Sequence, residues 1–196
     1  MNNKKAIQQS LFAKSSKSHK TDSRYGGELF KTRKGRQIPR PLTIKNTMHL
    51  VLRSSKAKEE WSFRRTENNK RIQQILNKFC SKYGVKLISR ANVGNHLHLH
   101  IKLSSRHTYK PFIRAITSAI AMAITGASRV KPLKTFLNGK FWDARPFTRF
   151  VDNWRYYFNL TEYIKVNQLE GSGLNRWEAR YVLAKEWDRA QAMEFT

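Results

Sequence analysis

One segment limits the possible folds more than any other, because its polar and apolar residues alternate strictly. Residues 95–103 read NHLHLHIKL. Successive side chains of a β-strand point to opposite faces, so His96, His98 and His100 share one face and the apolar residues between them share the other. The segment therefore predicts a strand that covers a core with one face and carries a row of imidazoles on the other.

The segments around this strand show the periodicities of further strands and helices in a regular order. Strands are expected at Thr47–Arg53, Val85–Asn92, His96–Leu103 and Arg145–Val151, and helices at Arg64–Lys82, Tyr109–Thr125, Asn153–Leu169 and Leu174–Met193. The order is β-α-β-β-α-β-α. It predicts an α+β, ferredoxin-like (RRM-like) fold, in which a four-stranded antiparallel sheet has helices on one face and its other face free.

The charge of the chain indicates a polyanionic partner. The 196 residues include 39 Lys and Arg against 13 Asp and Glu, a formal net charge of +26. Such a charge repels itself unless anions lie beside it, and nucleic acid is the commonest partner of this kind. A hydrophobic content of 39% is enough for a core, and the single cysteine, Cys80, excludes a disulfide framework and a cysteine-built zinc site.

Neither a membrane span nor a signal peptide is expected. The most apolar stretch, residues 115–127, is broken by Thr and Ser and is too short to cross a bilayer. The first residues, MNNKKAIQQSLFAK, lack the apolar centre of a signal peptide. The expected location is cytoplasmic, associated with the nucleoid of a prokaryote.

The sequence divides into three parts. Residues 1–42 form a basic arm that is expected to be flexible without DNA, residues 43–172 form the folded domain, and residues 173–196 form a helical extension. Residues 1–45 contain twelve Lys and Arg but only two acidic residues. The run KTRKGRQIPRP suits an extended strip along a phosphate backbone, and the alternative is a solubilising tail. The candidate DNA contacts in the arm are Arg24, Lys31, Arg33, Lys34, Arg36 and Arg40.

The histidine row is a candidate metal site. Two imidazoles at positions i and i+2 of one strand can chelate a single divalent cation without any change of the backbone. The alternatives are a polar row that faces solvent and a structural zinc site, which usually has four protein ligands.

A metal at a phosphate-binding surface suggests phosphoryl transfer, which needs a nucleophile. Tyr163 is the candidate, because Asn167 follows four residues later on the same face of the expected helix. This spacing lets a phenol oxygen reach a phosphate while an amide oxygen reaches the metal. Tyr156, Tyr157 and Tyr181 are rival nucleophiles, and a purely packing role for Tyr163 is the other alternative.

Three segments, in this order, resemble those of the single-tyrosine HUH transposases, which include REP-associated tyrosine transposases and transposases of short insertion sequences. They are Asn95-His96-Leu97-His98, Phe141–Phe147 (FWDARPF), and Tyr163-Ile164-x-x-Asn167 with Gly171 and Leu174. The resemblance covers roughly residues 43–174. It departs from the family at Gln168, where proline is common, and at His100, where an apolar residue is usual.

This resemblance implies an activity and a set of site residues. His96, His98 and Asn167 would hold Mg²⁺ or Mn²⁺. His100 is the reserve ligand, and if it binds the ion, the histidine pair would be His98 and His100. Tyr163 would be the catalytic nucleophile. The implied reaction is the cleavage and rejoining of single-stranded DNA through a 5′-phosphotyrosine, in transposition or on hairpin and palindromic repeats. The implied partner is hairpin-containing DNA, together with a second copy of the chain in those relatives that exchange the tyrosine helix.

Further DNA contacts are expected before the tyrosine helix, at Lys131, Lys134, Lys140, Arg145 and Arg149. Phe141 and Trp142 either stack on an unpaired base or pack a helix against the sheet. Two rival functions remain. One is a non-catalytic nucleic-acid-binding module, which would place aromatic residues rather than histidines on the sheet face. The other is a rolling-circle initiator or relaxase with the same chemistry.

Overall fold

The sheet has the predicted antiparallel topology. The computed structural model describes residues 25–26, 42–128, 130–132, 135 and 138–194. Its four main strands are β2 (Met48–Arg53), β3 (Val85–Asn92), β4 (His96–Leu103) and β5 (Phe147–Phe150), which lie in the order β5-β2-β4-β3. A two-residue strand, β1 (Tyr25–Gly26), pairs with the outer side of β5. The ferredoxin-like fold class is confirmed.

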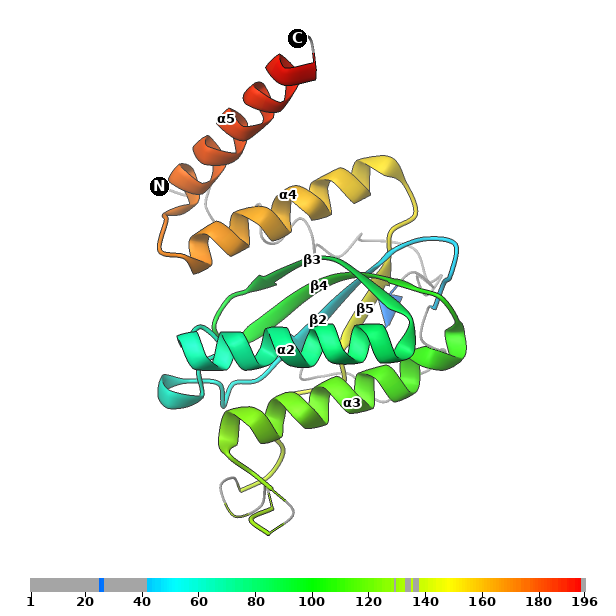
Figure 1. Cartoon of the computed structure of the whole chain (residues 1–196), viewed down its shortest axis with the longest axis vertical. Helices are drawn as coiled ribbons and strands as arrows, with labels where there is room; N and C mark the ends of the chain where they lie inside the picture. The colour runs from blue at the N-terminus through cyan, green and yellow to red at the C-terminus, as the bar shows by residue number, and fades with distance from the viewer. Residues whose placement is uncertain (1–24, 27–41, 129, 133–134, 136–137, 195–196) are drawn as a thin grey trace, which may run out of the picture.

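Two helices cover one face of this sheet. They are α2 (Thr66–Tyr83) and α3 (Arg106–Thr125), which lie side by side below the strands in Figure 1. A short 3₁₀ helix, η1 (Glu59–Trp61), precedes α2. Gly84 ends α2 in the left-handed conformation (φ 61°), which glycine adopts at little cost, and the Ser105 hydroxyl accepts from the backbone N–H of His107 at the start of α3. Both helices that connect neighbouring strands therefore pack on the same face of the sheet.

The core lies between the sheet and these two helices. It contains Leu97, Leu99, Ile101 and Leu103 of β4, together with Phe112 of α3. The prediction that the apolar residues of this strand face the helices is therefore confirmed. The histidines of β4 necessarily point to the opposite face.

The opposite face is not free, and this part of the prediction was wrong. The helix α4 (Trp154–Gly171) lies over it, on the side away from α2 and α3 (Figure 1). Leu160 and Ile164 of α4 pack with Ala91 of β3 in a second, smaller core. At the end of α4 the backbone comes so close to β3 that a Cβ on Gly171 would lie 2.9 Å from the carbonyl oxygen of Asn92. The helix that carries Tyr163 is thus packed directly on the sheet.

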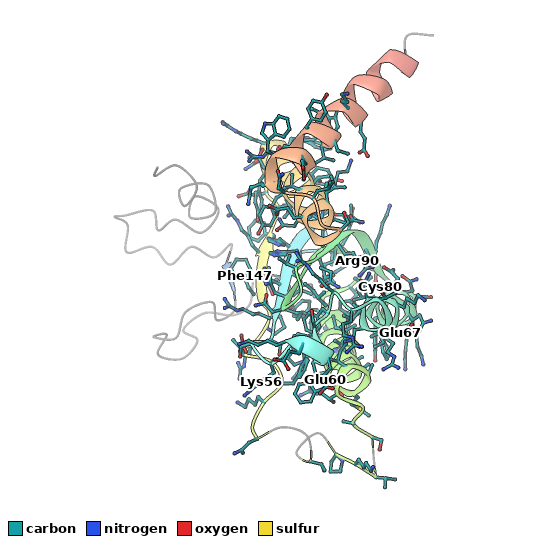
Figure 2. All side chains as sticks on the ribbon, turned by 90° about the vertical axis from the view of Figure 1, so that its left-hand side faces the viewer. Lys56, Glu60, Glu67, Cys80, Arg90 and Phe147 are labelled. Carbon is teal, nitrogen blue, oxygen red and sulfur yellow. The ribbon has the colours of Figure 1, made fainter. Side chains whose placement is uncertain are left out.

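The last helix, α5 (Arg176–Glu194), packs on α4 rather than on the sheet. Val166 of α4 contacts Ala179 and Leu183 of α5, and the rest of α5 extends away from the domain, as the side view in Figure 2 also shows. Among the described residues, no helix is both long and apolar enough to span a membrane.

Candidate active site

The sheet face under α4 brings three imidazoles together. His96 and His98 lie on β4, and their ring centroids are 4.9 Å apart. His49 of β2 lies opposite His100 in the strand register and therefore on the same face, and its ring stacks on His98 at 5.3 Å. Two neighbouring strands thus supply the row of rings, whereas the sequence predicted it from β4 alone.

Tyr163 of α4 lies directly over this row. Its ring meets His98 edge-on, with centroids 5.2 Å apart, and lies 6.5 Å from His49. Asn153 caps the start of the helix, because its side chain accepts from the backbone N–H of Tyr156, and the apolar residues of α4 hold it on the sheet. A single chain therefore brings together the predicted nucleophile and the predicted metal-binding imidazoles.

The ring nitrogens of His96 and His98 are arranged as in metal-binding histidines. His98 Nδ1 lies 3.1 Å from His49 Nε2, and His96 Nδ1 lies 2.6 Å from Asn95 Oδ1. Metal-ligating histidines usually engage one ring nitrogen with a neighbour and present the other to the metal. The Nε2 atom of His98 is buried and has no hydrogen-bond partner among the described residues. The predicted ligands therefore fit a divalent cation.

The third predicted ligand, Asn167, is buried one helical turn after Tyr163. Its amide nitrogen donates to the carbonyl oxygen of Tyr163 at 2.6 Å, which leaves the amide oxygen for another partner. The described residues contain no group of three or more His, Cys, Asp or Glu side chains close enough to hold an ion. An ion at the histidine pair would therefore need a ligand of another type, such as this amide.

The reserve ligand, His100, has different surroundings. Its Nε2 lies 2.7 Å from the hydroxyl of Thr47, and its ring packs against Tyr157 with centroids 5.0 Å apart. The side chain is fully buried. Its Nδ1, like Nε2 of His98, is buried and has no hydrogen-bond partner among the described residues, so these contacts leave both histidine pairs open as the metal pair.

Burial keeps the imidazoles neutral. It is the main cause that lowers the pKa of His49 to about 3 and the pKa of His100 to about 4, and it also lowers the pKa of His96 and His98. Neutral imidazole is the form that binds metals. Burial also raises the pKa of Tyr163, whereas the Asn167 side chain and the charge of Arg176 oppose this rise. The phenol is therefore protonated at neutral pH before substrate and metal bind.

These pKa shifts predict that the metal-free protein loses stability in mild acid. A histidine in the unfolded chain titrates near pH 6.5, whereas native His49 and His100 stay neutral down to about pH 3 and about pH 4. Below about pH 6.5 the unfolded chain thus binds protons that the native protein does not. Each of these two histidines then lowers the free energy of unfolding by up to about 1.4 kcal/mol per pH unit.

The expected loss at about pH 5 is on the order of 2 kcal/mol for each of the two histidines. Urea unfolding at about pH 7 and about pH 5 measures it. The His107→Gln variant, altered at an exposed position of α3, should show the same loss as the wild type. Equal stability at the two pH values would contradict the prediction.

The other predicted DNA contacts fall into three groups. Lys131, Lys140 and Arg145 are exposed in the loop before β5. Arg149 is half-buried on β5, with its guanidinium carbon 4.1 Å from the centroid of the Tyr156 ring. Arg24, Lys31, Arg33, Lys34, Arg36, Arg40 and Lys134 lie outside the described residues. A DNA contact at each of these positions stays a prediction.

The two aromatic residues of the FWDARPF segment take part in packing. Phe141 is buried in the main core, so it is not available to stack on a base. Trp142 packs on the same core, and its indole nitrogen donates to the carbonyl oxygen of Thr117 in α3 at 2.9 Å. These contacts match the packing alternative, and base stacking by the half-buried Trp142 stays a prediction.

The sequence prediction missed His49. The alternation of residues 47–53 placed it on the polar face of its strand, so a signal was present. Its contact with His98 depends on the pairing of β2 with β4, which the sequence pattern does not specify.

The comparisons with known proteins give the family of the chain. The family model described as "Transposase IS200 like" matches residues 43–167. The chain belongs to this family. IS200-like transposases act on DNA, so the predicted nucleic-acid partner is DNA. No curated protein matches the sequence.

Two solved structures resemble this transposase. One is titled as a REP-associated tyrosine transposase bound to a REP hairpin, with 14% identity, a TM-score of 0.53, and coverage of 69% of this chain and 74% of that chain. The other is a candidate transposase from Deinococcus radiodurans R1, with 17% identity, a TM-score of 0.40, and coverage of 69% and 98%. The first likeness confirms the fold.

Proposed function

We propose that this transposase cleaves and rejoins single-stranded DNA through a covalent bond between Tyr163 and a 5′-phosphate. The observation that carries the proposal is the position of the Tyr163 ring, edge-on to His98 within one chain. In both neighbouring histidines, His96 and His98, the Nδ1 atom already contacts another side chain, as in histidines that bind a metal through Nε2. A tyrosine used only for packing would not need such a pair beside it. Because Tyr163 and His98 of the same chain lie together, we also propose that the tyrosine acts within its own subunit.

In the proposed reaction, the phenol oxygen of Tyr163 attacks the scissile phosphorus. The bond from Tyr163 Oη to phosphorus forms, and the bond from phosphorus to the 3′ oxygen breaks. The phenol proton leaves to solvent, and the departing 3′ oxygen takes up a proton. Since the phosphotyrosine keeps a phosphodiester bond, the reverse attack by a 3′-hydroxyl rejoins the strands without an added energy source.

His96, His98 and Asn167 would hold Mg²⁺ or Mn²⁺. The bound cation would polarise the scissile phosphate and favour the phenolate form of Tyr163. Two neutral imidazoles and a neutral amide leave its charge undiminished, and imidazole ligands favour manganese over magnesium. The substrate that we propose is single-stranded DNA with a hairpin. It would place the protein at the nucleoid of a prokaryotic cell.

The direct test uses one hairpin-containing single-stranded DNA labelled at either end, with Mn²⁺ or with EDTA. With Mn²⁺, DNA labelled at its 3′ end should migrate with the protein on a denaturing gel, whereas DNA labelled at its 5′ end should give a free, shorter fragment. EDTA should abolish both products. A labelled 5′ end on the protein would show the opposite polarity, and the absence of any adduct across a set of hairpins would contradict the proposal.

A further inference from the structure

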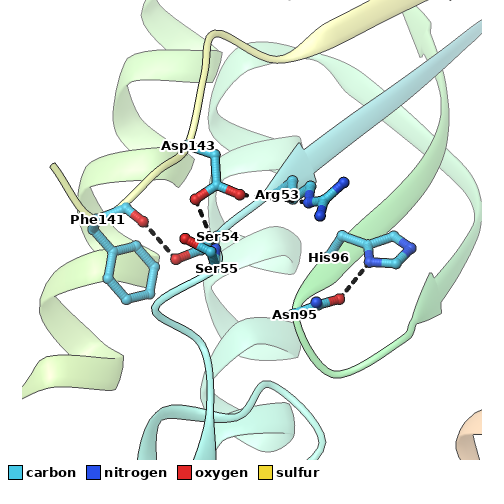
Figure 3. A network of polar contacts seen from close by, with 7 residues as sticks. All are labelled: Arg53, Ser54, Ser55, Asn95, His96, Phe141 and Asp143. Atoms are coloured by element: carbon cyan, nitrogen blue, oxygen red, sulfur yellow. Dashed lines mark hydrogen bonds and ion pairs between the residues drawn. The ribbon is translucent and has the colours of Figure 1, made fainter. Parts of the chain in front are cut away.

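Arg53 lies at the end of the imidazole row and belongs to no role described so far. It is the last residue of β2, directly opposite His96 in the register with β4, so both side chains project from the same face of the sheet. In Figure 3 the Arg53 guanidinium lies between Asp143 and the turn that carries Asn95 and His96. Its side chain is 62% exposed.

Asp143 holds Arg53 from the side away from His96. The Asp143 carboxylate lies 3.4 Å from Arg53 Nε and accepts from the backbone N–H of Ser55 at 2.7 Å. The backbone N–H of Asp143 donates to the carbonyl oxygen of Arg53 at 3.0 Å. Figure 3 shows the two contacts of the Asp143 carboxylate. The arginine is thereby fixed through Nε, and its two terminal nitrogens have no ion-pair partner among the described residues.

The ion pair between Arg53 and Asp143 is not explained by stability. The ion pair is exposed on the arginine side, and exposed ion pairs contribute little to folding. The position of Arg53 nevertheless matters for the imidazole row. Arg53 is paired with His96 in the strand register, so its charge lies on the same sheet face, beside that ring. A cation is therefore positioned beside a candidate metal ligand, where an anion would complement it.

We propose that Arg53 binds a non-bridging oxygen of the scissile phosphate and that Asp143 is its positioning residue. This assignment rests on the proposed function. Tyr163 lies over His98 and His49, whereas Arg53 is paired with His96, at the other member of the histidine pair. A phosphate at that pair would meet the phenol at the His98 end and the guanidinium at the His96 end. The planar guanidinium suits a phosphate that gains negative charge as the phenol oxygen adds.

The first measurement is the single-turnover cleavage rate of the full-length protein on a hairpin DNA with Mn²⁺. Arg53→Ala should slow cleavage by about 10²- to 10³-fold, as loss of one preorganised transition-state contact does. Arg53→Lys should recover part of the rate, because it restores the charge without the forked geometry. Arg106→Ala, altered at an exposed arginine of α3, is the matched control and should cleave at the wild-type rate.

The decisive measurement repeats the comparison on a DNA with a methylphosphonate at the scissile position, which replaces a charged non-bridging oxygen by a neutral methyl group. If Arg53 neutralises that charge, wild type and Arg53→Ala should cleave this substrate at nearly equal rates. An arginine that only supports the fold would show the same defect on both substrates. An undiminished defect on the methylphosphonate, or none on ordinary DNA, would overturn the assignment.

Asp143→Asn tests the positioning role. It should slow cleavage less than Arg53→Ala, and it should cause no further loss when Arg53 is already alanine, because Asp143 acts through Arg53. Additive losses in the double variant would contradict that role. The result with the wild type separates this inference from the proposed function. If the wild type forms no adduct, both the proposed reaction and the Arg53 assignment are contradicted. If the wild type is active and Arg53→Ala is equally active, only the Arg53 assignment is contradicted.

Discussion

Replacing Tyr163 with phenylalanine is expected to abolish the covalent protein–DNA adduct while hairpin binding is retained. The phenol oxygen is the only atom that the substitution removes, and the aromatic ring still packs edge-on against His98. Loss of the attacking atom in covalent catalysis lowers the rate by many orders of magnitude, here by about 10⁴-fold or more. A denaturing gel with DNA labelled at its 3′ end detects the adduct, and a mobility-shift assay measures binding.

The matched control is Tyr157→Phe. Tyr157 lies on the same helix and its ring packs against His100, so it is near the imidazole row but is not the proposed nucleophile. This variant should form the adduct like the wild type. An adduct with Tyr163→Phe, or its loss only with Tyr157→Phe, would show that the nucleophile has been misassigned.

The strands and their faces could be predicted because local alternation determines them. In β4 the apolar residues face α2 and α3, as period two requires, and the bounds of β3 and β4 agree with the sequence prediction. The position of α4 could not be predicted in this way. Its apolar residues indicate a packed helix, but nothing local tells which face of the sheet it covers. The prediction of a free face failed for this reason.

The same distinction applies to the site. His96, His98, Tyr163 and Asn167 were found through short motifs, and the structure brings the first three together. His49 and Arg53 were missed because their relevance depends on strand pairing. The contact between Arg53 and Asp143 joins residues far apart in sequence. Contacts of this kind depend on how the strands pair and how the chain folds back on itself, and a local sequence pattern does not specify either.

A second large effect is expected from the two histidines that flank His98. His96→Ala should weaken Mn²⁺ binding by about 100-fold or more and abolish cleavage, because it removes one of three ligands, and loss of even an outer-shell partner costs about 10- to 100-fold in affinity. His100→Ala should leave Mn²⁺ affinity within a few-fold of the wild type. The family resemblance assigns the metal to His96 and His98, and His100 instead contacts Thr47 through Nε2 and Tyr157 through its ring.

Calorimetric titration of the metal-free proteins with Mn²⁺ measures both affinities directly, without reference to activity. His100 is fully buried, so its replacement by alanine is expected to lower thermal stability, and both variants must be titrated well below their unfolding temperatures. The half-buried His96 gives the cleaner variant. If His100→Ala lost Mn²⁺ binding and His96→Ala kept it, the ligands would be His98 and His100, and the ion would lie one step further along β4, close to Thr47 and away from Arg53.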